Sequence, residues 1–453
     1  AWQDQVPMIF LTGCVDAAEA ESYTHQVFDH TKVIAPISKA SMVAADGAVD
    51  VMIDKALAIA TADPPGPVHI DVPIGLAGAV SKPSGYPRYT KPSLTVPADG
   101  PDLARARDAI ANAERPLMIC GVEVLHHDAA DAVSEVAHRL SIPTLTSYKA
   151  KGVIAEDDLL SLGGHGLSPK SFKLLKPLID DADVIVLAGY DPIEMRIDWR
   201  HVWQPDTEGK TVIEISAQPN RHFVHQADIS FVCDVGAGLR ALTEGLNGKP
   251  TWADGKALKM RESLKAAFPT DEVWGPAAVI DAARQAFPKH GFAAVDTGAH
   301  RILLSQQWTC YGPRTLVQST GLCTMGCAMP LAMGHKIANP DTPVIAFTGD
   351  AGMEMILGEM ATLRDMKLPV VTIVFVDESL SLIELKQRAN SQDNVGVDFG
   401  GTDFAAVAQA MGGNGVTATS REALMSAIEA GLNADTFTII ACPIGRKAYD
   451  GRF

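Results

Sequence analysis

The segment 344–387 constrains the fold of this chain most strongly. It contains two apolar runs, at 344–347 and 370–376, which are separated by a helix-like stretch, and an acidic residue, Asp350 or Asp377, follows each run. Two buried strands that are joined by a crossover helix lie parallel in one sheet, so their carboxyl ends meet at one edge. Ligands of open α/β sheets bind at that edge. The pattern therefore predicts an α/β fold with two carboxylates beside a ligand site.

The two carboxylates indicate a magnesium site that is shared with a phosphate group. The helix that starts after Asp350 directs unpaired backbone N–H groups at the same edge, which favours an anion such as a diphosphate. Mg²⁺ takes oxygen ligands and usually shares them with phosphates. The alternative is that Asp350 caps its helix and Asp377 begins a surface turn. Either residue alone fits that alternative, whereas the combined strand–helix–strand pattern favours the metal site.

Three segments separate at Pro-rich boundaries, and we expect each of them to form a domain. The first ends at residue 84, a linker rich in Pro, Gly and Ser follows at 85–101, and the others span 102–250 and 270–453. The last two alternate helical patterns with fully apolar strands, which is typical of parallel sheets covered on both faces. The predicted strands are 116–121, 142–147, 183–189, 211–216, 292–296, 344–349, 370–376 and 437–442, and the predicted helices include 104–113, 129–140 and 171–182.

Composition argues against several classes of function. The formal net charge of −16 argues against nucleic acid and anionic membrane surfaces as partners. The sequence has no apolar run long enough to span a bilayer, and its first residues lack the features of a signal peptide. Its seven cysteines form no CxxC pair, and Cys323 and Cys327 have no further zinc ligands nearby. We therefore expect free thiols in a cytoplasmic protein.

Several motifs together resemble those of the thiamine-diphosphate (ThDP) enzymes, in particular the acetolactate synthase-like branch. These motifs are PISK at 36–39, GPVHIDVP at 66–73, DTGAH at 296–300, GLCTMG at 321–326, and GDA at 349–351 followed by the acid at 377. The resemblance covers essentially the whole chain and is most specific after residue 290. It implies three doubly wound parallel-sheet α/β domains. The first segment (1–84) is then the C-terminal half of a pyrimidine-binding domain, the second a central Rossmann-like domain and the third a diphosphate-binding domain.

By this resemblance the metal ligands are Asp350, Asp377 and the backbone carbonyl of Ser379. The family usually has Asn where this chain has Asp377, and two carboxylates ~4 Å apart repel by roughly 4 kcal/mol at an effective dielectric of ~20. A bound dication offsets much of that repulsion. The chain also has GDA where the family has GDG. If that position needs a positive φ, Ala351 costs roughly 1 kcal/mol, unless Gly352 takes the permissive role.

The resemblance also implies the contacts to the cofactor. Met325 is the bulky apolar residue that bends the cofactor into its reactive V shape, and backbone atoms near Cys323 accept a hydrogen bond from the aminopyrimidine. The full cofactor-binding set is Thr297, Gly298, Ala299, His300, Cys323, Met325, Gly349, Asp350, Ala351, Gly352, Leu380 and Leu382. The alternatives are that Met325 belongs to a helix core and that His300 is a solvent-facing turn residue.

A further set of expectations concerns catalysis and assembly. In the family a Glu near the start of the pyrimidine domain activates the cofactor, and no early acid of this sequence stands in the matching context. We expect that Glu in an upstream half-domain, which is either missing from a truncated sequence or is a separate polypeptide. Gln26 aligns with a Gln that reaches toward the substrate, or else it is a surface residue. The family site lies between subunits, which implies a homodimer or a homotetramer.

The resulting interpretation is a ThDP- and Mg²⁺-dependent enzyme that decarboxylates a 2-oxo acid and carries out carboligation. The alternatives are a simple 2-oxo acid decarboxylase and a non-catalytic ThDP-fold protein that binds or regulates. An NAD-dependent oxidoreductase is disfavoured because no GxGxxG motif follows a strand in the central segment. Acetolactate synthases also hold FAD on the central domain, and the sequence leaves FAD and the identity of the 2-oxo acid open.

Overall fold

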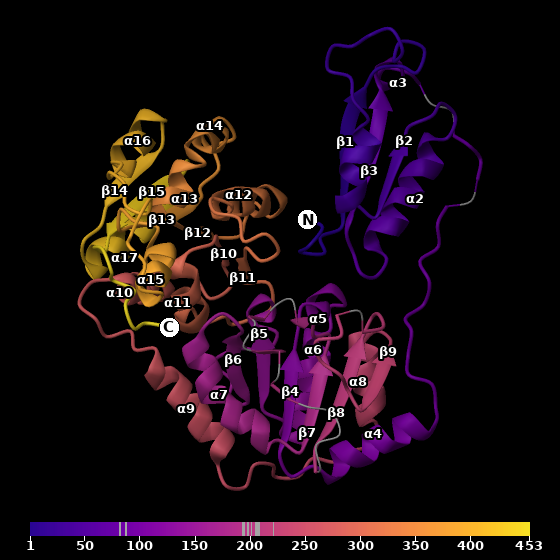
Figure 1. Cartoon of the computed structure of the whole chain (residues 1–453), viewed down its shortest axis with the longest axis vertical. Coiled ribbons are helices and arrows are strands. Elements are labelled where there is room, and N and C mark those ends of the chain that lie inside the picture. Colours follow the sequence, from indigo (N-terminus) through magenta and orange to yellow (C-terminus); the bar gives the residue numbers. More distant parts are fainter. Residues whose placement is uncertain are drawn as a thin grey trace. The chain divides into compact units, whose positions relative to one another are not determined.

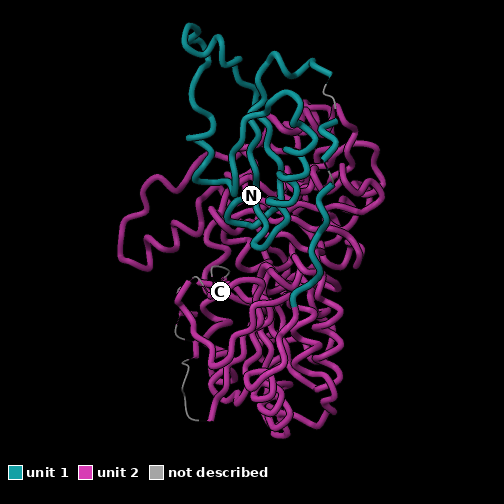
Figure 2. Tube along the Cα trace, turned by 90° about the vertical axis from the view of Figure 1, so that its right-hand side faces the viewer, with its two compact units in different colours: residues 1–95 teal, residues 96–453 magenta. Residues whose placement is uncertain are grey.

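The chain divides into two compact units, Ala1–Thr95 and Val96–Phe453 (Figure 2). The computed structural model describes residues 1–80, 83–86, 88–192, 195–196, 199–200, 202–203, 209–220 and 222–453. Among these residues, no helix combines the length and the apolar character that crossing a bilayer requires. Each unit is described by itself below.

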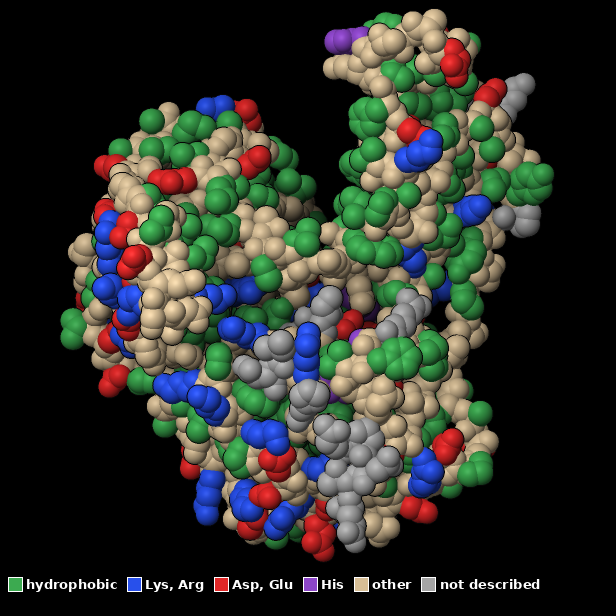
Figure 3. Space-filling model, in the orientation of Figure 1, with side chains coloured by type: hydrophobic (Ala, Val, Ile, Leu, Met, Phe, Trp, Pro, Cys, Tyr) green, Lys and Arg blue, Asp and Glu red, His purple; other side chains and the backbone are tan. Residues whose placement is uncertain are grey.

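The first unit is built on a parallel sheet with the strand order β1-β3-β2. Its elements are β1 (Met8–Cys14), α1 (His30–Ile34), η1 (Ala35–Ile37), β2 (Ala40–Val43), α2 (Val49–Thr61), β3 (Pro67–Pro73) and α3 (Ile74–Ala77). Its buried core is small, because only Ala56 and Ala60 of α2 and Val68 and Ile70 of β3 form a buried apolar cluster among the described residues. Many other apolar side chains of this unit remain exposed, and they are visible as green patches in Figure 3.

The second unit contains two six-stranded parallel sheets within its described residues. The strand order is β6-β5-β4-β7-β8-β9 in the central sheet and β11-β10-β12-β13-β15-β14 in the C-terminal sheet. Helices cover both faces of each sheet, so each sheet lies between two apolar clusters (Figure 1). Strands that are buried on both faces explain the continuous apolar runs of the sequence. The predicted α/β class is confirmed.

The elements around the central sheet alternate strand and helix along the chain. They are α4 (Pro101–Asn112), β4 (Pro116–Cys120), α5 (Glu123–His126), α6 (Ala130–Leu140), β5 (Thr144–Ser147), η2 (Tyr148–Ala150), β6 (Ser161–His165), α7 (Pro169–Asp181), β7 (Val184–Ala188), β8 (Thr211–Ser216), β9 (Ile229–Val232), α8 (Val235–Thr243) and α9 (Lys256–Ala267). The predicted strands β4, β5, β7 and β8 and the predicted helices α4, α6 and α7 are confirmed.

The C-terminal sheet follows the same plan. Its elements are α10 (Pro276–Ala286), β10 (Phe292–Val295), α11 (Ala299–Gln307), β11 (Leu316–Gln318), α12 (Ala328–Ala338), β12 (Val344–Gly349), α13 (Asp350–Glu354), η5 (Leu357–Glu359), α14 (Met360–Asp365), β13 (Val371–Val376), α15 (Ser381–Ala389), α16 (Phe404–Ala410), β14 (Asn414–Thr417), α17 (Arg421–Leu432) and β15 (Thr438–Pro443). The predicted strands β10, β12, β13 and β15 are confirmed. The single crossover helix expected after Asp350 is instead divided into α13, η5 and α14.

Each of the two large sheets reverses its strand order at one point. In the central sheet the chain leaves β4 in one direction toward β5 and later returns to its other side as β7. In the C-terminal sheet β10 has β11 on one side and β12 on the other. Ligands of open parallel sheets bind at the carboxyl ends of the strands that flank such a point. The second unit therefore offers two positions for a ligand site.

Candidate functional site

A cavity lies at the reversal point of the C-terminal sheet, between the loops that follow β10, β12 and β13. The structure brings thirteen of the residues predicted from sequence into its lining. They are Thr297, Gly298, Ala299, His300, Met325, Gly349, Asp350, Ala351, Gly352, Asp377, Ser379, Leu380 and Leu382. Residues from four separate stretches of the chain thus form one concave site.

The two predicted metal-binding acids lie against one another in this cavity. Asp350 and Asp377 are 4% and 7% exposed. The Oδ2 atom of Asp350 accepts hydrogen bonds from the backbone N–H groups of Asp377 at 3.0 Å and of Glu378 at 2.7 Å. The Asp377 carboxylate in turn accepts from the Ser379 N–H at 3.3 Å and from the Ser381 hydroxyl. The parallel pairing of β12 with β13 accounts for this arrangement, because it places both strand ends at the same edge.

Both carboxyl groups hold a proton more tightly than an ordinary aspartic acid. Burial raises the pKa of Asp350, and the N–H groups of Glu378, Ala351 and Asp377 offset this only in part. Burial and the charge of Asp350 together raise the pKa of Asp377 to about 6, although the hydrogen bond from the Ser381 hydroxyl opposes the shift. Two buried acids that repel one another are stabilised by a cation between them. Hard oxygen ligands of this kind suit Mg²⁺.

Hydrogen-bond donors without partners line the same cavity. The Thr297 and Ser379 hydroxyls are buried and have no partner among the described residues. Helix α11 begins at Ala299 and α15 at Ser381, and within the described chain no side chain caps either N-terminus. A buried polar group without a partner costs about 1–3 kcal/mol, and helix N-termini attract anions. The donors therefore fit a diphosphate that bridges to a metal ion held by the acids.

Asp296 organises the cavity, although it was not among the predicted site residues. It is fully buried, and its carboxylate accepts hydrogen bonds from the Gly326 N–H at 2.6 Å, the Thr348 hydroxyl at 2.8 Å and His300 Nε2 at 2.7 Å. These bonds tie the end of β10 to α11, to the loop before α12 and to β12. Its position in the sequence could have identified it as a site residue, because Asp296 directly follows β10 just as Asp350 directly follows β12.

His300 is held inside the site and does not face solvent. It is 4% exposed, and its ring stacks on Phe375 at a centroid distance of 5.4 Å. A Cβ atom on Gly298 would lie 2.5 Å from the His300 ring, which is closer than two such atoms can approach. Glycine is therefore required at position 298 by the close packing of this ring. The alternative of a solvent-facing turn residue is wrong.

The GDA sequence carries no backbone strain. Ala351 lies within α13 and is not among the residues with positive φ. Gly352 does not have positive φ either, but a Cβ atom there would lie 2.5 Å from Asp296 Oδ2 and 2.7 Å from the Thr348 hydroxyl. Glycine is required at position 352 by this close approach and not by its backbone conformation.

Two predicted site residues do not line the cavity. Cys323 is exposed, with a φ of 52°, and its thiol donates to the Thr320 carbonyl at 3.0 Å. Gln26 is an exposed residue of the first unit with a φ of 57°. Their functional roles stay predictions. Conversely, Phe375, Ser381, Ile383 and Tyr449 line the cavity and were not predicted.

At the reversal point of the central sheet, a buried carboxylate is bonded across the strand ends. Glu123 follows β4, is 6% exposed, and accepts hydrogen bonds from the Ala217 N–H at 2.9 Å and the Ser216 hydroxyl at 3.2 Å. A Cβ atom on Gly189, after β7, would lie 2.7 Å from Glu123 Cβ. Burial raises the pKa of Glu123. A flavin or nucleotide diphosphate would meet this carboxylate at the described ends of β4 and β8.

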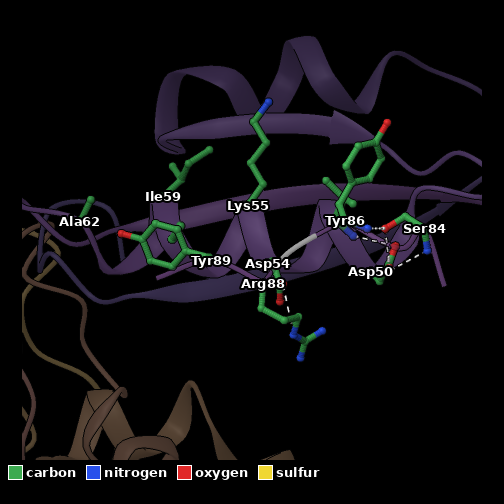
Figure 4. A pocket seen from close by; sticks show the side chains of 11 residues that line it. Asp50, Asp54, Lys55, Ile59, Ala62, Ser84, Tyr86, Arg88 and Tyr89 are labelled. Carbon is green, nitrogen blue, oxygen red and sulfur yellow. Dashed lines mark hydrogen bonds and ion pairs between the residues drawn. The ribbon is translucent and has the colours of Figure 1, made fainter. Parts of the chain in front are cut away.

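The first unit has a groove between α2 and the residues around Tyr89 (Figure 4). Asp50 accepts hydrogen bonds from the backbone and the hydroxyl of Ser84, both at 2.9 Å, and Arg88 pairs with Asp54 at 3.4 Å. None of the predicted site residues lines this groove. Its acids hold the following segment to the helix, so the groove belongs to the packing of the unit.

Two family models match the second unit. The C-terminal TPP binding domain of thiamine pyrophosphate enzymes matches residues 296–442, a stretch that begins at Asp296 and includes both acids of the cavity. The central domain of thiamine pyrophosphate enzymes matches residues 103–242. The chain belongs to the thiamine pyrophosphate enzyme family.

Its similarity to acetolactate synthases extends along nearly the whole chain. The acetolactate synthase of Bacillus subtilis (strain 168) is 26% identical over 461 residues, which cover 97% of this chain and 77% of that protein. The acetolactate synthase large subunit of Parasynechococcus marenigrum (strain WH8102) is 29% identical over 484 residues, with 98% and 74% covered. The catabolic acetolactate synthase of Raoultella terrigena is 24% identical, with 97% and 79% covered. The predicted family resemblance is confirmed.

Proposed function

We propose that this protein is a ThDP- and Mg²⁺-dependent enzyme that decarboxylates a 2-oxo acid and joins the remaining fragment to a second carbonyl compound. The observation that carries this proposal is the buried pair of Asp350 and Asp377 beside donors without partners, within the stretch that matches the TPP-binding domain. The names of the relatives support carboligation as the reaction type.

In this proposal Asp350, Asp377 and the backbone carbonyl of Ser379 hold the metal ion. The Thr297 hydroxyl and the N-termini of α11 and α15 bind the diphosphate. When bound, ThDP supplies an electron sink that allows a 2-oxo acid to lose CO₂. The apolar side chains of Met325, Leu380 and Leu382 hold the rings and exclude water from them. Gln26 is the proposed contact to the substrate from the first unit.

The hydrogen bond to Asp296 orients the imidazole of His300. An ionised carboxylate can only accept a hydrogen bond, so the N–H group at His300 Nε2 donates the hydrogen bond to Asp296 Oδ1. This leaves Nδ1 as the nitrogen that faces Gly298 and Gly349, where added Cβ atoms would lie 2.5 Å and 3.6 Å from it. Nδ1 is the ring nitrogen that remains for a hydrogen bond beside the cofactor.

The proposal includes no flavin, because the Glu123 carboxylate lies at the described strand ends of the central sheet and would repel a flavin diphosphate. It includes a cytoplasmic location, a small-molecule 2-oxo acid and a homodimer or homotetramer. The net charge of −16 supports partners other than nucleic acid.

The test is a reaction of the full chain with pyruvate and with a panel of other 2-oxo acids, in the presence of ThDP and Mg²⁺. Released CO₂ and the carboligation product are both measured, with Asp350→Ala as the inactive control. CO₂ with an acetolactate-type product supports the proposal. CO₂ with an aldehyde alone indicates a simple decarboxylase. ThDP binding without any CO₂ indicates the non-catalytic alternative.

A further inference from the structure

The segment after β15, residues 444–453, forms one wall of the cofactor cavity. Tyr449 of this segment lines the cavity together with Asp350 and Asp377, and it is 3% exposed. It also belongs to the apolar cluster on one face of the C-terminal sheet, against which Phe453 packs. A residue far along the chain from both acids is thereby brought to the metal-binding end of the site.

Polar contacts hold this segment against the walls of the cavity. The Ile444 N–H donates to the Val376 carbonyl at 2.9 Å, directly before Asp377. Asp450 pairs with Arg388 of α15 at 2.6 Å, and α15 begins at the cavity. Arg446 pairs with Asp398 at 3.2 Å and with Glu378 at 3.6 Å. These pairs are half-exposed, so each contributes little alone, but together they fix the segment where Tyr449 enters the site.

The Tyr449 hydroxyl is a donor that has no acceptor within the described part of the chain. Burial raises its pKa well above the ordinary value, and the charges of Asp377 and Asp350 raise it further. A tyrosine with an ordinary pKa of about 10 is already protonated at physiological pH, so the hydroxyl is a donor in either case. The Tyr449 side chain lines the cavity, where its hydroxyl can donate a hydrogen bond to a ligand.

The cavity also lacks positive side chains. No lysine or arginine is among the described residues that line it. The charge of a bound diphosphate must therefore be met by the metal ion, by helix N-termini and by neutral hydroxyls. The hydroxyls of Thr297, Ser379 and Tyr449 are the side-chain donors of this kind that are not engaged with another described residue.

We propose that the Tyr449 hydroxyl donates a hydrogen bond to a diphosphate oxygen of bound ThDP, and that the segment 444–453 thereby retains the cofactor. This inference rests on the proposed function. It assigns to Tyr449 a binding role in addition to those of the strand-end acids and hydroxyls, from a segment that follows the last strand of the sheet.

The test compares the wild type with Tyr449→Phe, which keeps the ring and its packing. Isothermal titration in the presence of Mg²⁺ measures the affinity for ThDP and, separately, for inorganic pyrophosphate. We expect both affinities to fall about 10-fold in the variant, as for loss of one hydrogen bond to a charged group. The matched control is Tyr311→Phe, whose ring packs under Lys289 away from the cavity. It should bind both ligands as the wild type does.

Each outcome distinguishes the inference from the proposed function. If Tyr449→Phe binds both ligands as tightly as the wild type, the inference is overturned and the proposed function stands. If it loses affinity for ThDP but not for pyrophosphate, the phenol contacts another part of the cofactor and the inference is again overturned. If the wild type binds neither ligand, both are overturned.

A second variant tests the retaining segment without altering the cavity. Asp450→Asn removes the ion pair with Arg388, whose guanidinium keeps its bonds to Glu384. Stopped-flow displacement should show ThDP leaving this variant several-fold faster than the wild type, with the thermal midpoint of the metal-free protein nearly unchanged. An unchanged dissociation rate would contradict the retaining role.

Discussion

The two six-stranded sheets of the second unit both reverse their strand order beside their first strand. They differ in whether the polar groups at that point have hydrogen-bond partners. In the central sheet the Glu123 carboxylate is bonded to Ser216 and Ala217 across the strand ends. In the C-terminal sheet Thr297 and Ser379 keep hydroxyls without described partners. Two repelling acids lie beside these hydroxyls. The shared topology supplies a position for a ligand, and the unsatisfied groups decide which of the two positions binds one.

Removal of Asp350 should have the largest effect on ligand binding at the C-terminal sheet. Asp350→Ala should abolish Mg²⁺-dependent ThDP binding, with an affinity loss of at least about 100-fold, because it removes a metal ligand and the acceptor of two backbone N–H groups. Titration calorimetry measures the effect. The matched control is Glu123→Gln in the other sheet, which should bind ThDP normally. Retained Mg²⁺-dependent affinity in Asp350→Ala would refute the site.

Asp296→Ala should cause the next largest change, in stability. It leaves the Gly326 N–H, the Thr348 hydroxyl and His300 without their buried acceptor. At about 1–3 kcal/mol for each lost partner, the free energy of unfolding should fall by roughly 3–5 kcal/mol. Urea denaturation without ThDP measures it. Glu123→Ala, which frees two donors, should cost less, and an equal or larger loss there would contradict the central role of Asp296.

The acid pair predicts a pH dependence for the metal-free protein. The pKa of Asp377 is raised from 3.8 to about 6 in the folded state, so the folded protein binds its proton more tightly than the unfolded chain does. The corresponding stability is fully present below about pH 4 and is lost as the pH rises through 6. The loss is on the order of 3 kcal/mol.

Asp377→Asn removes this titration while leaving the other groups of the protein in place. With a chelator present, the variant should therefore be more stable than the wild type at pH 7, and by much less at pH 4.5. Denaturant titrations at the two pH values measure the difference. A stability difference that does not change with pH would contradict the assignment of the shift to this residue. With Mg²⁺ added, the wild type should lose this disadvantage, because the dication offsets the charge of the deprotonated acids.

The smallest expected effect concerns the central sheet. The purified protein should show no flavin absorbance, and added FAD should leave its thermal midpoint unchanged, because the Glu123 carboxylate would repel the flavin diphosphate at these strand ends. Flavin fluorescence titration is the measurement. A protein that is purified yellow, or that binds FAD in the micromolar range, would show that the central sheet also binds a ligand at its reversal point.

The strands show how much of the fold the sequence predicts. All eight strands predicted for the second unit are interior strands of the two sheets, whereas β6, β9, β11 and β14 were missed. These four are the edges of their sheets. An interior strand is packed on both faces and must be continuously apolar. Edge strands are short, and they carry Gly and polar residues that read as loops, as in Ser161–His165 and Asn414–Thr417.

The positions of the two acids follow from the sequence pattern alone, because parallel strands joined by a crossover place their carboxyl ends at the same edge of the sheet. Asp350, Asp377 and their neighbours could therefore be identified from strand ends alone. The roles of Asp296, Tyr449 and Glu123, in contrast, become visible only in the folded protein. Their roles depend on which donors and acceptors meet across the sheet edge, and a hydrogen bond acts over about 3 Å between groups whose separation in sequence carries no information about that distance.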